Sequence, residues 1–381
     1  MITAVADASQ VAEARRLVSE VARGAGLMDA RVAEIAIVVT ELATNLLKHG
    51  RGGHILANRY DDGGGDALHV LALDQGTGMA DVGRCMEDGY STAGSPGNGL
   101  GAVARLADDL LVYSRPGLGS VIAVRFRAGN HHAGGTHGAA SHPGNGHPGI
   151  GQSGNGQSGN SHAGNTHGGN SPGGIRHAGN TRPGTSYPGI QLGAVAAQYP
   201  GERICGDQWA FRDTAHGPTL LVADGAGHGP EAARAAQAAV QTFLQQPDAS
   251  TETLVDRIHR ALMPTRGAAV AIARIDLAAR LVRYTGVGNI CGVLITAEAP
   301  KHMVSHNGTA GHVAPRIREF TYPFTGKPLV LLHSDGITSR WDLGSYPGLA
   351  GQHPSLIAGV LLRDHRRTRD DATVVAMRPV P

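Results

Sequence analysis

The sequence has 381 residues, with 33 basic and 31 acidic side chains and a formal net charge of +2. This length suffices for two or three domains, and the small net charge, with both signs scattered along the chain, does not favour nucleic-acid binding. The three cysteines are far apart and form no C-x-x-C pair, which disfavours a zinc ribbon or a disulfide framework. No stretch approaches the roughly 20 apolar residues of a membrane span and none resembles a signal peptide, so we expect a cytoplasmic protein.

Two helices are predicted near the start of the chain, the first ending near Arg23 and the second spanning Asp29–Lys48. In the second helix, Glu41, Asn45 and His49 are spaced four apart and therefore share one face. A carboxylate, an amide and an imidazole on one face can approach a magnesium–phosphate group. A solvated polar stripe would have the same spacing, so the spacing alone leaves both interpretations open.

Two strands are predicted next, at 54–60 and 68–73, and the second continues into D-Q-G-T-G-M. Asp74, at the end of this strand, can accept a hydrogen bond from an exocyclic amine such as that of adenine. Gly76 and Gly78 permit a close approach of the backbone to a flat ring. Taken alone, this motif is as typical of a turn as of a binding site.

A glycine-rich run, D-G-Y-S-T-A-G-S-P-G-N-G-L-G-A, occupies residues 88–102. Gly97, Gly99 and Gly101 leave backbone amides accessible where a helix is expected at about 100–109. Amides before a helix N-terminus suit a chain of phosphates, although a G-x-G-x-G run is weak evidence by itself. A strand pair is expected to follow, to about residue 127.

In this order, the three motifs resemble those of the GHKL ATPase superfamily, and most closely those of the small serine kinases that act as anti-sigma factors or RsbT-type switch kinases. The resemblance covers residues 5 to 127 and implies an α/β GHKL (Bergerat) ATP-binding sandwich that uses ATP with Mg²⁺. It implies that Glu41 is the general base, that Asn45 is a magnesium ligand and that Asp74 contacts adenine. Gly76 and Gly78 would shape the adenine pocket, and Ser120 would supply the hydroxyl that a threonine usually provides. The phosphate lid would consist of Gly97, Gly99, Leu100 and Gly101.

The middle of the chain, residues 129–190, consists largely of Gly, Asn, Ser, His and Pro. Such a segment buries too little apolar surface to offset the entropy of ordering it. We predict a disordered linker between domains at 1–128 and 191–381. Its histidines also permit a metal-binding tract, and this alternative remains open.

In the second half, apolar strands are followed by aspartates. Strands are predicted at 191–198, 219–223, 267–275, 279–286, 288–295 and 327–333, with a last strand after Asp371, and helices at 230–245 and 251–262. The aspartates occur as G-D at Asp207, D-G-A-G-H-G from Asp224, S-D-G at Asp335 and D-D at Asp370. A single Asp-Gly is more typical of a turn, but four aspartates in this order are more specific, and carboxylates with a backbone carbonyl suit magnesium or manganese.

This order resembles that of the PPM-type serine/threonine phosphatases of the SpoIIE and RsbX kind, over residues 193 to 378. The resemblance implies an α+β domain with an antiparallel β-sandwich core flanked by helices, two Mn²⁺ or Mg²⁺ ions, and attack by a metal-activated water on phosphoserine or phosphothreonine. It implies metal ligation by Asp207, Asp224, Asp335, Asp370 and the carbonyl of Gly225, with Asp224 and Asp335 central to catalysis. Asp371 is a weaker candidate, and His228 is expected near the site without being a ligand.

The two resemblances together predict a bifunctional regulator of a partner-switching pathway. The first domain would phosphorylate a STAS-type antagonist protein and the second would remove phosphate from the same or a related phosphoprotein. A sigma factor or a downstream phosphatase is a further candidate partner. The alternative is a first domain that binds ATP and sequesters a partner, such as a sigma factor, without transferring phosphate.

Overall fold

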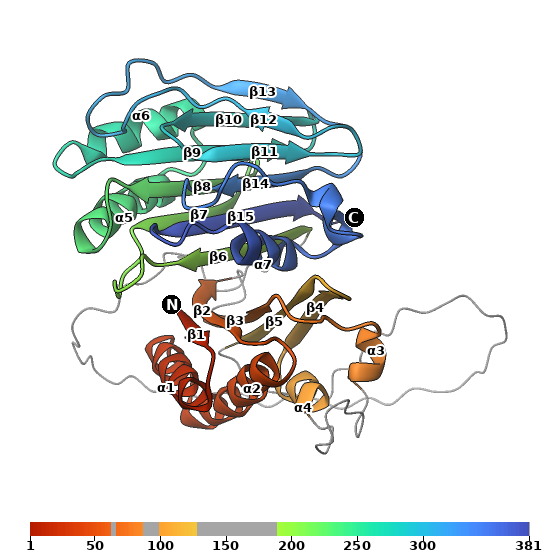
Figure 1. Ribbon diagram of the computed structural model, residues 1–381. Coiled ribbons are helices and arrows are strands. Elements are labelled where there is room, and N and C mark those ends of the chain that lie inside the picture. Colours follow the sequence, from red (N-terminus) through yellow and green to blue (C-terminus); the bar gives the residue numbers. More distant parts are fainter. Residues whose placement is uncertain (62–65, 87–98, 128–188, 381) are drawn as a thin grey trace, which may run out of the picture. The chain divides into compact units, whose positions relative to one another are not determined.

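The structure is a computed structural model that describes residues 1–61, 66–86, 99–127 and 189–380 (Figure 1). The chain divides into two units, residues 1–128 with 176–381, and residues 129–175. The second unit, and almost all of the predicted linker at 129–190, lies outside the described residues. All contacts reported below are within the first unit.

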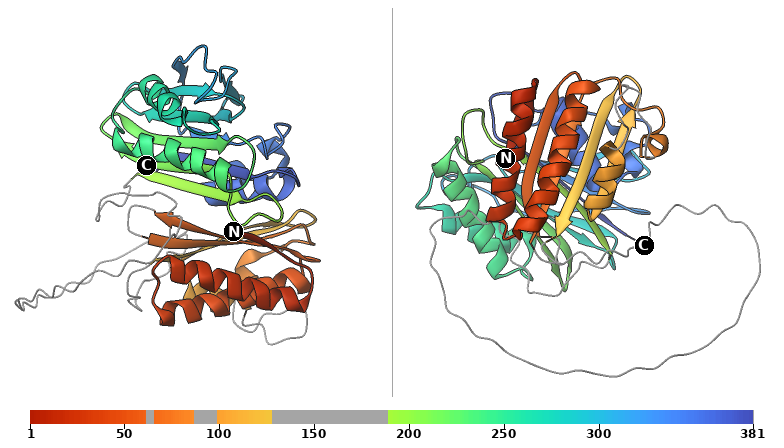
Figure 2. Two further views of the ribbon diagram at one scale, coloured as in Figure 1. Left: turned by 90° about the vertical axis from the view of Figure 1, so that its left-hand side faces the viewer. Right: turned by 90° about the horizontal axis from the view of Figure 1, so that it is seen from below.

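The N-terminal region contains one antiparallel sheet with the strand order β1-β2-β3-β5-β4. The strands are β1 (Ile2–Val5), β2 (Gly53–Asp61), β3 (Asp66–Asp74), β4 (Asp109–Arg115) and β5 (Gly119–Arg127). Helices α1 (Ala8–Gly24), α2 (Asp29–Lys48) and α4 (Gly99–Leu106) cover one face of this sheet, and a short α3 (Val82–Cys85) follows β3 (Figures 1 and 2). The predicted α/β sandwich is confirmed, with Asp7 capping α1 through bonds from the Ser9 and Gln10 amides. The predicted helix at 100–109 ends earlier, at Leu106, because β4 begins at Asp109.

This sheet is apolar on both faces. Alternate residues of β3, such as Leu68 and Val70, face the helices and join their core. Leu71 and Leu73, which point to the opposite face of β3, are also buried, and they belong to a different cluster together with Val121 of β5. An antiparallel sheet with one solvated face alternates apolar and polar residues, so this pattern indicates a second covered face.

The C-terminal region consists of two five-stranded antiparallel sheets with the orders β13-β10-β9-β8-β7 and β12-β11-β14-β15-β6. The strands are β6 (Ile190–Ala197), β7 (Asp207–Thr214), β8 (Gly217–Gly225), β9 (Ala268–Asp276), β10 (Leu281–Val287), β11 (Cys291–Ile295), β12 (Lys301–Met303), β13 (Phe320–Pro323), β14 (Leu329–His333) and β15 (Ala372–Pro379). One apolar cluster joins inner-face residues of both sheets, including Leu220, Val222, Val330 and Leu332. Helices α5 (Pro230–Gln245) and α6 (Thr251–Leu262) pack on the first of these sheets. The predicted antiparallel sandwich flanked by helices is confirmed.

The helix α7 (Pro354–His365) is absent from the sequence prediction. Every residue from Pro354 to Leu362 is buried, so the segment has no polar face and no helical period in its hydrophobicity. A helix that is apolar all round is typical of a helix covered on all sides. α7 contacts β6 and β15 on one side, and β3 and β5 on another.

Gly359 lies where α7 meets the sheet of the N-terminal region. A Cβ at this position would lie 2.7 Å from Val121 Cγ1 and 3.1 Å from Leu71 Cδ2. We expect Gly359→Leu to lower the free energy of unfolding by about 1–3 kcal/mol or more, because the larger side chain overpacks this contact. Denaturant unfolding checks this, with Gly24→Leu as the matched control, since a Cβ at Gly24 meets no atom within 4 Å. Equal effects of the two substitutions would contradict the packing of α7 on β3 and β5.

His69 of β3 is buried, and burial lowers the pKa of its imidazole to about 3, with contributions from Arg125 and His353. Between the ordinary value of 6.5 and this value, the unfolded chain binds a proton that the folded chain does not. The contribution of neutral His69 to the free energy of unfolding is therefore fully present above about pH 6.5. It decreases as the pH falls below that value, by up to about 1.4 kcal/mol per pH unit. His69→Gln should flatten this dependence between pH 6.5 and 5 in denaturant unfolding, whereas the exposed His216→Gln should not.

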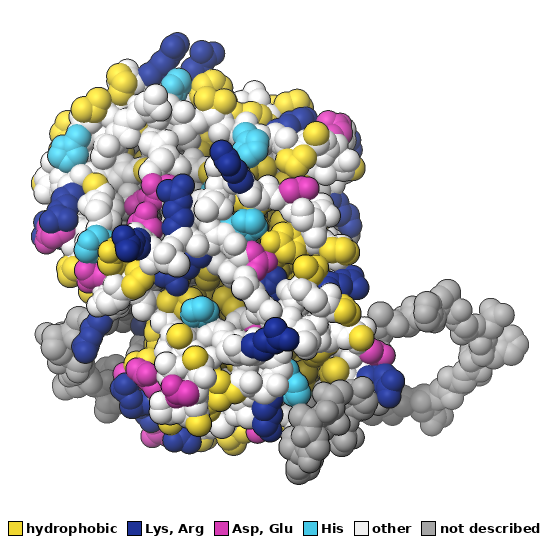
Figure 3. Space-filling model, viewed as in Figure 1, with side chains coloured by type: hydrophobic (Ala, Val, Ile, Leu, Met, Phe, Trp, Pro, Cys, Tyr) yellow, Lys and Arg dark blue, Asp and Glu magenta, His cyan; other side chains and the backbone are white. Residues whose placement is uncertain are grey.

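Charged side chains of both signs are interspersed on the face drawn in Figure 3. In the parts of the chain that the structure describes, no helix is long and apolar enough to cross a membrane.

Candidate nucleotide and metal sites

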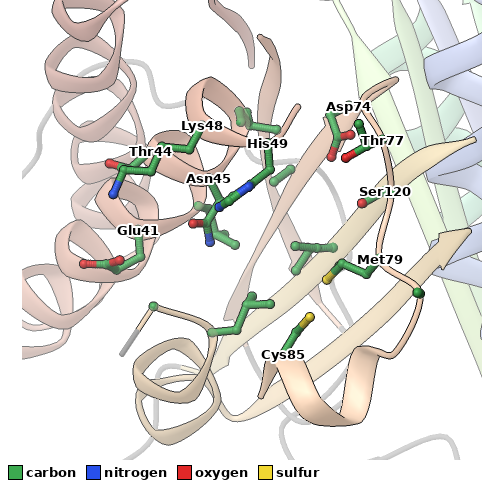
Figure 4. Close-up of a pocket in the computed structure, with 18 of the residues that line it drawn as sticks. Glu41, Thr44, Asn45, Lys48, His49, Asp74, Thr77, Met79, Cys85 and Ser120 are labelled. Atoms are coloured by element: carbon green, nitrogen blue, oxygen red, sulfur yellow. The ribbon is translucent and has the colours of Figure 1, made fainter. Parts of the chain in front are cut away.

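A cavity of about 630 Å³ opens beside α2 in the N-terminal region (Figure 4). Its walls come from α2, the loop after β3, the start of α4 and β5. The sequence-predicted residues that line it are Glu41, Asn45, His49, Asp74, Gly78, Gly99, Leu100 and Ser120. The structure thus brings together residues from all three predicted motifs.

Helix α2 presents the polar face that the spacing predicted. Glu41 and Asn45 are half-buried on this face, and His49 is the exposed residue that caps the helix. Figure 4 places Glu41 and Asp74 at opposite ends of the cavity, with Asn45 and His49 on the wall between them. The carboxylate of α2 is therefore available to one end of a bound molecule and the carboxylate of β3 to the other.

Asp74 is held rigidly at the end of β3. Its Oδ1 accepts a hydrogen bond from the Gly76 amide at 2.8 Å, and Asp74 pairs with Ser120 across the β3–β5 ladder. Burial raises the pKa of the Asp74 carboxyl, while the Gly76 amide and Arg363 oppose this effect. A Cβ at residue 76 would lie 2.3 Å from the His49 carbonyl oxygen, so only glycine allows this loop to approach the end of α2.

The start of α4 faces the other carboxylate. A Cβ at Gly99 would lie 3.2 Å from Glu41 Oε2 and 3.7 Å from Asn45 Nδ2. Leu100 also lines the cavity, and Gly101 is buried in the same helix without being part of the lining. Gly97 lies outside the described residues.

Thr77, Met79 and Cys85 are among the other residues that line the cavity. Thr77 and Met79 belong to the D-Q-G-T-G-M motif, so their nearness to Asp74 was readable from the sequence. Cys85 was not predicted as a site residue. Its position on α3, the helix that follows this motif, is the sequence feature that could have indicated it. Met79 and Cys85 give the cavity an apolar wall suited to a flat ring.

The four predicted aspartates of the C-terminal region lie at or beside the ends of four strands. Asp207 begins β7 and is the cross-strand partner of Asp224, near the end of β8. Asp335 follows β14 and Asp370 precedes β15, strands that pair with each other in the second sheet. Both sheets of the sandwich thus contribute aspartates.

The charges of these carboxylates act on one another. Burial raises the pKa of Asp224, and the negative charges of Asp207, Asp335 and Asp370 raise it further. Burial also raises the pKa of Asp207, with a contribution from Asp371. Buried carboxylates of one sign are costly unless a cation or protons compensate them, so this part of the structure is suited to cations.

Hydrogen bonds fix some oxygens of these aspartates and leave others without a partner. Asp207 Oδ2 accepts from Ser334 Oγ at 2.6 Å, and Asp335 Oδ2 accepts from Asn289 Nδ2 at 2.7 Å. Asp207 Oδ1 and Asp371 Oδ2 are buried and have no hydrogen-bond partner among the described residues. Asp371 Oδ1 accepts from the Tyr199 amide, so Asp371 belongs to the same buried carboxylate group.

In the described ranges, no group of three or more His, Cys, Asp or Glu side chains is already arranged to hold a metal ion. The unpartnered oxygens and the raised pKa values nevertheless fit metal ions as the missing partners. Only glycine fits at residue 225 beside α5, because a Cβ there would lie 2.0 Å from the Ala232 carbonyl oxygen. His228 is exposed, is stacked on Tyr199 and contacts Glu202 Oε1 at 2.9 Å through Nδ1.

Two family profiles match the chain. That of the histidine kinase-like ATPase domain matches residues 4–126, close to the predicted 5–127. That of stage II sporulation protein E (SpoIIE) matches residues 215–380. This second range includes Asp224, Asp335 and Asp370, whereas Asp207 precedes it.

Two proteins of Bacillus subtilis (strain 168) are similar in sequence. The serine/threonine-protein kinase RsbT is 37% identical over 112 residues, which are 29% of this chain and 84% of RsbT. The phosphoserine phosphatase RsbX is 23% identical over 176 residues, which are 46% of this chain and 87% of RsbX.

Among solved structures, RsbX in complex with magnesium has 23% identity and a TM-score of 0.46, covering 50% of this chain and 96% of that chain. A structure described under the bacterial stressosome has 28% identity and a TM-score of 0.47, covering 50% of this chain and 99% of that chain. Through its RsbT-like first region, this chain belongs to the histidine kinase-like (GHKL-like) ATPase family, and its residues 215–380 are similar to the SpoIIE family.

Proposed function

We propose that this chain is a bifunctional regulator of a partner-switching pathway. The N-terminal region transfers phosphate from Mg-ATP to a serine or threonine of a STAS-type antagonist protein. The C-terminal region removes phosphate from the same protein or a related one. The chain's similarity to a serine/threonine kinase and to a phosphoserine phosphatase supports this pairing of activities.

The observation that carries the kinase half is the position of Glu41 and Asn45 opposite the first turn of α4. Backbone amides at the start of α4 receive the phosphates, and Asn45 holds the magnesium ion. Glu41 accepts the proton of the attacking hydroxyl, which is the task of a general base. Asp74 recognises the adenine at the other end of the cavity.

In the phosphatase half, Asp207, Asp224, Asp335 and Asp370 hold two Mg²⁺ or Mn²⁺ ions together with the Gly225 carbonyl. When bound, these ions supply an activated water and neutralise charge on the phosphoryl group. The chain's own residues orient the carboxylates, since Ser334 holds Asp207 and Asn289 holds Asp335. Asp371 is the weaker candidate ligand, because its Oδ1 accepts from the Tyr199 amide and only its buried Oδ2 has no partner among the described residues.

The test uses the intact chain, radiolabelled ATP with Mg²⁺, and a STAS-domain protein. Asp224→Asn should let labelled STAS protein accumulate, and addition of the unmodified chain with Mn²⁺ should then remove the label. If the chain binds nucleotide and partner but transfers no phosphate, the N-terminal region is a sequestering module and the kinase half is wrong. If the label stays after the unmodified chain is added, the two activities have different substrates.

A further inference from the structure

Two apolar surfaces of this chain cover each other. The sheet face formed by Leu71, Leu73 and Val121 belongs to one apolar cluster with Ile357 and Leu361 of α7. Neither surface would be stable in water, since contiguous exposed apolar area is rare in soluble proteins. α7 is therefore a structural element of both the N-terminal sheet and the phosphatase sandwich.

Polar contacts at the end of α7 reach the wall of the nucleotide cavity. Arg363, whose side chain is 4% exposed, donates from Nη1 to the Asp74 carbonyl oxygen at 3.0 Å. The neighbouring Asp364 accepts from Gln75 Nε2 at 2.9 Å and is paired with Arg363 at 2.7 Å. The side chain of Asp74 thus lines the cavity, while its carbonyl group is held from behind by α7.

The same end of α7 also holds the loop that carries Asp335. The Thr338 amide donates to the His365 carbonyl oxygen at 2.9 Å, and the Arg367 amide donates to the Gly336 carbonyl oxygen at 2.7 Å. A Cβ at Gly336 would lie 1.9 Å from the Asp371 carbonyl oxygen, so this loop packs tightly on the Asp370–Asp371 segment. A shift of this end of α7 must therefore move or strain the loops of two aspartates.

We propose that α7 couples the two sites, so that nucleotide binding in the cavity changes the phosphatase activity of the C-terminal region. The proposal rests on the proposed function, because it takes the cavity as the nucleotide site and the aspartates as the phosphatase site. A nucleotide bonded to the Asp74 side chain restrains the peptide group whose oxygen Arg363 binds. Arg363 and Asp364 transmit that restraint over a few residues of rigid helix to the Asp335 loop.

Coupling of this kind requires that nucleotide has different affinities for the chain with the Asp74–Arg363 contact formed and with it broken. Typical coupling between two sites changes a binding affinity by about 5- to 150-fold. The contacts connect the Asp74 carbonyl oxygen to Arg363 by a hydrogen bond, and the end of α7 to the Asp335 loop by the Thr338–His365 hydrogen bond. The decisive evidence is the loss of the nucleotide effect when the path is cut while both sites remain intact.

The experiment measures hydrolysis of p-nitrophenyl phosphate by the intact chain in Mn²⁺, with and without a non-hydrolysable ATP analogue. Free Mn²⁺ is held constant, because the analogue chelates it. We expect the analogue to change kcat/KM by about fivefold or more. In Gln75→Ala/Arg363→Lys the change should fall below about twofold, with the rate in the absence of nucleotide retained.

Two matched controls, Gln241→Ala and Arg260→Lys, change exposed side chains of α5 and α6 and should keep the full nucleotide effect. Asp74→Asn should abolish the effect by removing the adenine contact. Gln75 is exposed, so Gln75→Ala alone keeps the test decisive should the double variant not fold.

Calorimetric titration of the analogue separates the two ways in which the coupling can fail. Binding without any change in hydrolysis, or an equal change in the double variant, overturns the coupling and leaves the proposed function intact. An absence of nucleotide binding overturns the coupling and the proposed kinase activity together.

Discussion

Asp224→Asn should lower the phosphatase rate of the intact chain by about 10³-fold or more, because it removes several kcal/mol of metal-dependent transition-state stabilisation. Asp224 is the carboxylate on which the charges of Asp207, Asp335 and Asp370 all act. Asparagine keeps the shape of the side chain and removes its negative charge. Hydrolysis of a phosphoserine peptide in Mn²⁺ measures the effect.

Thermal unfolding distinguishes loss of metal binding from loss of the fold. Without metal, Asp224→Asn should be at least as stable as the unmodified chain, because it removes a buried charge that neighbouring carboxylates repel. Mn²⁺ should raise the melting temperature of the unmodified chain and raise that of the variant much less. Asp256→Asn, which alters an ion pair with Arg260 on α6, is the matched control and should behave as the unmodified chain. A variant rate within tenfold of the original would contradict the assignment of Asp224.

Helices with one apolar face could be predicted from the sequence, and a helix that is apolar all round could not. The helices α1, α2, α5 and α6 each bury one side and appear close to their predicted bounds. α7 was missed because it is covered on more than one side, which removes the polar positions that make a helical period visible. The covering surface comes from β3 and β5, far away in the sequence, so local pattern could not reveal it.

Site residues that belong to a sequence motif could be predicted. Those that are brought to the site only by the fold could not. Asp74, Gly99 and Glu41 come from three separate motifs, and the structure places all three around one cavity. Asp371, by contrast, follows Asp370 directly, and only the fold reveals that one of its buried oxygens has no partner among the described residues. The contact of Arg363 with the Asp74 carbonyl oxygen joins residues 289 positions apart, and no local signal marks it.

Glu41→Gln should lower phosphotransfer to the partner protein by about 10²- to 10⁴-fold, the usual contribution of a general base. Glutamine has the same shape as glutamate but does not take up a proton. Since Asp74 and Ser120 are unchanged at the other end of the cavity, nucleotide affinity should stay within a few-fold of the original. Transfer of label from ATP measures the rate, and calorimetric titration of a non-hydrolysable analogue measures the affinity.

The pairing of these two measurements is what tests the role of Glu41. A residue that only shapes the cavity would change affinity and rate together, whereas a general base changes the rate alone. Glu20→Gln is the matched control, because Glu20 is exposed on α1 and pairs only with Arg16 in the described part of the chain. If Glu41→Gln transfers phosphate at the original rate, Glu41 is not the base. If the unmodified chain binds nucleotide and partner without transferring phosphate, ATP serves here to hold a partner, and the two regions would then be a nucleotide-dependent binding module joined to a phosphatase.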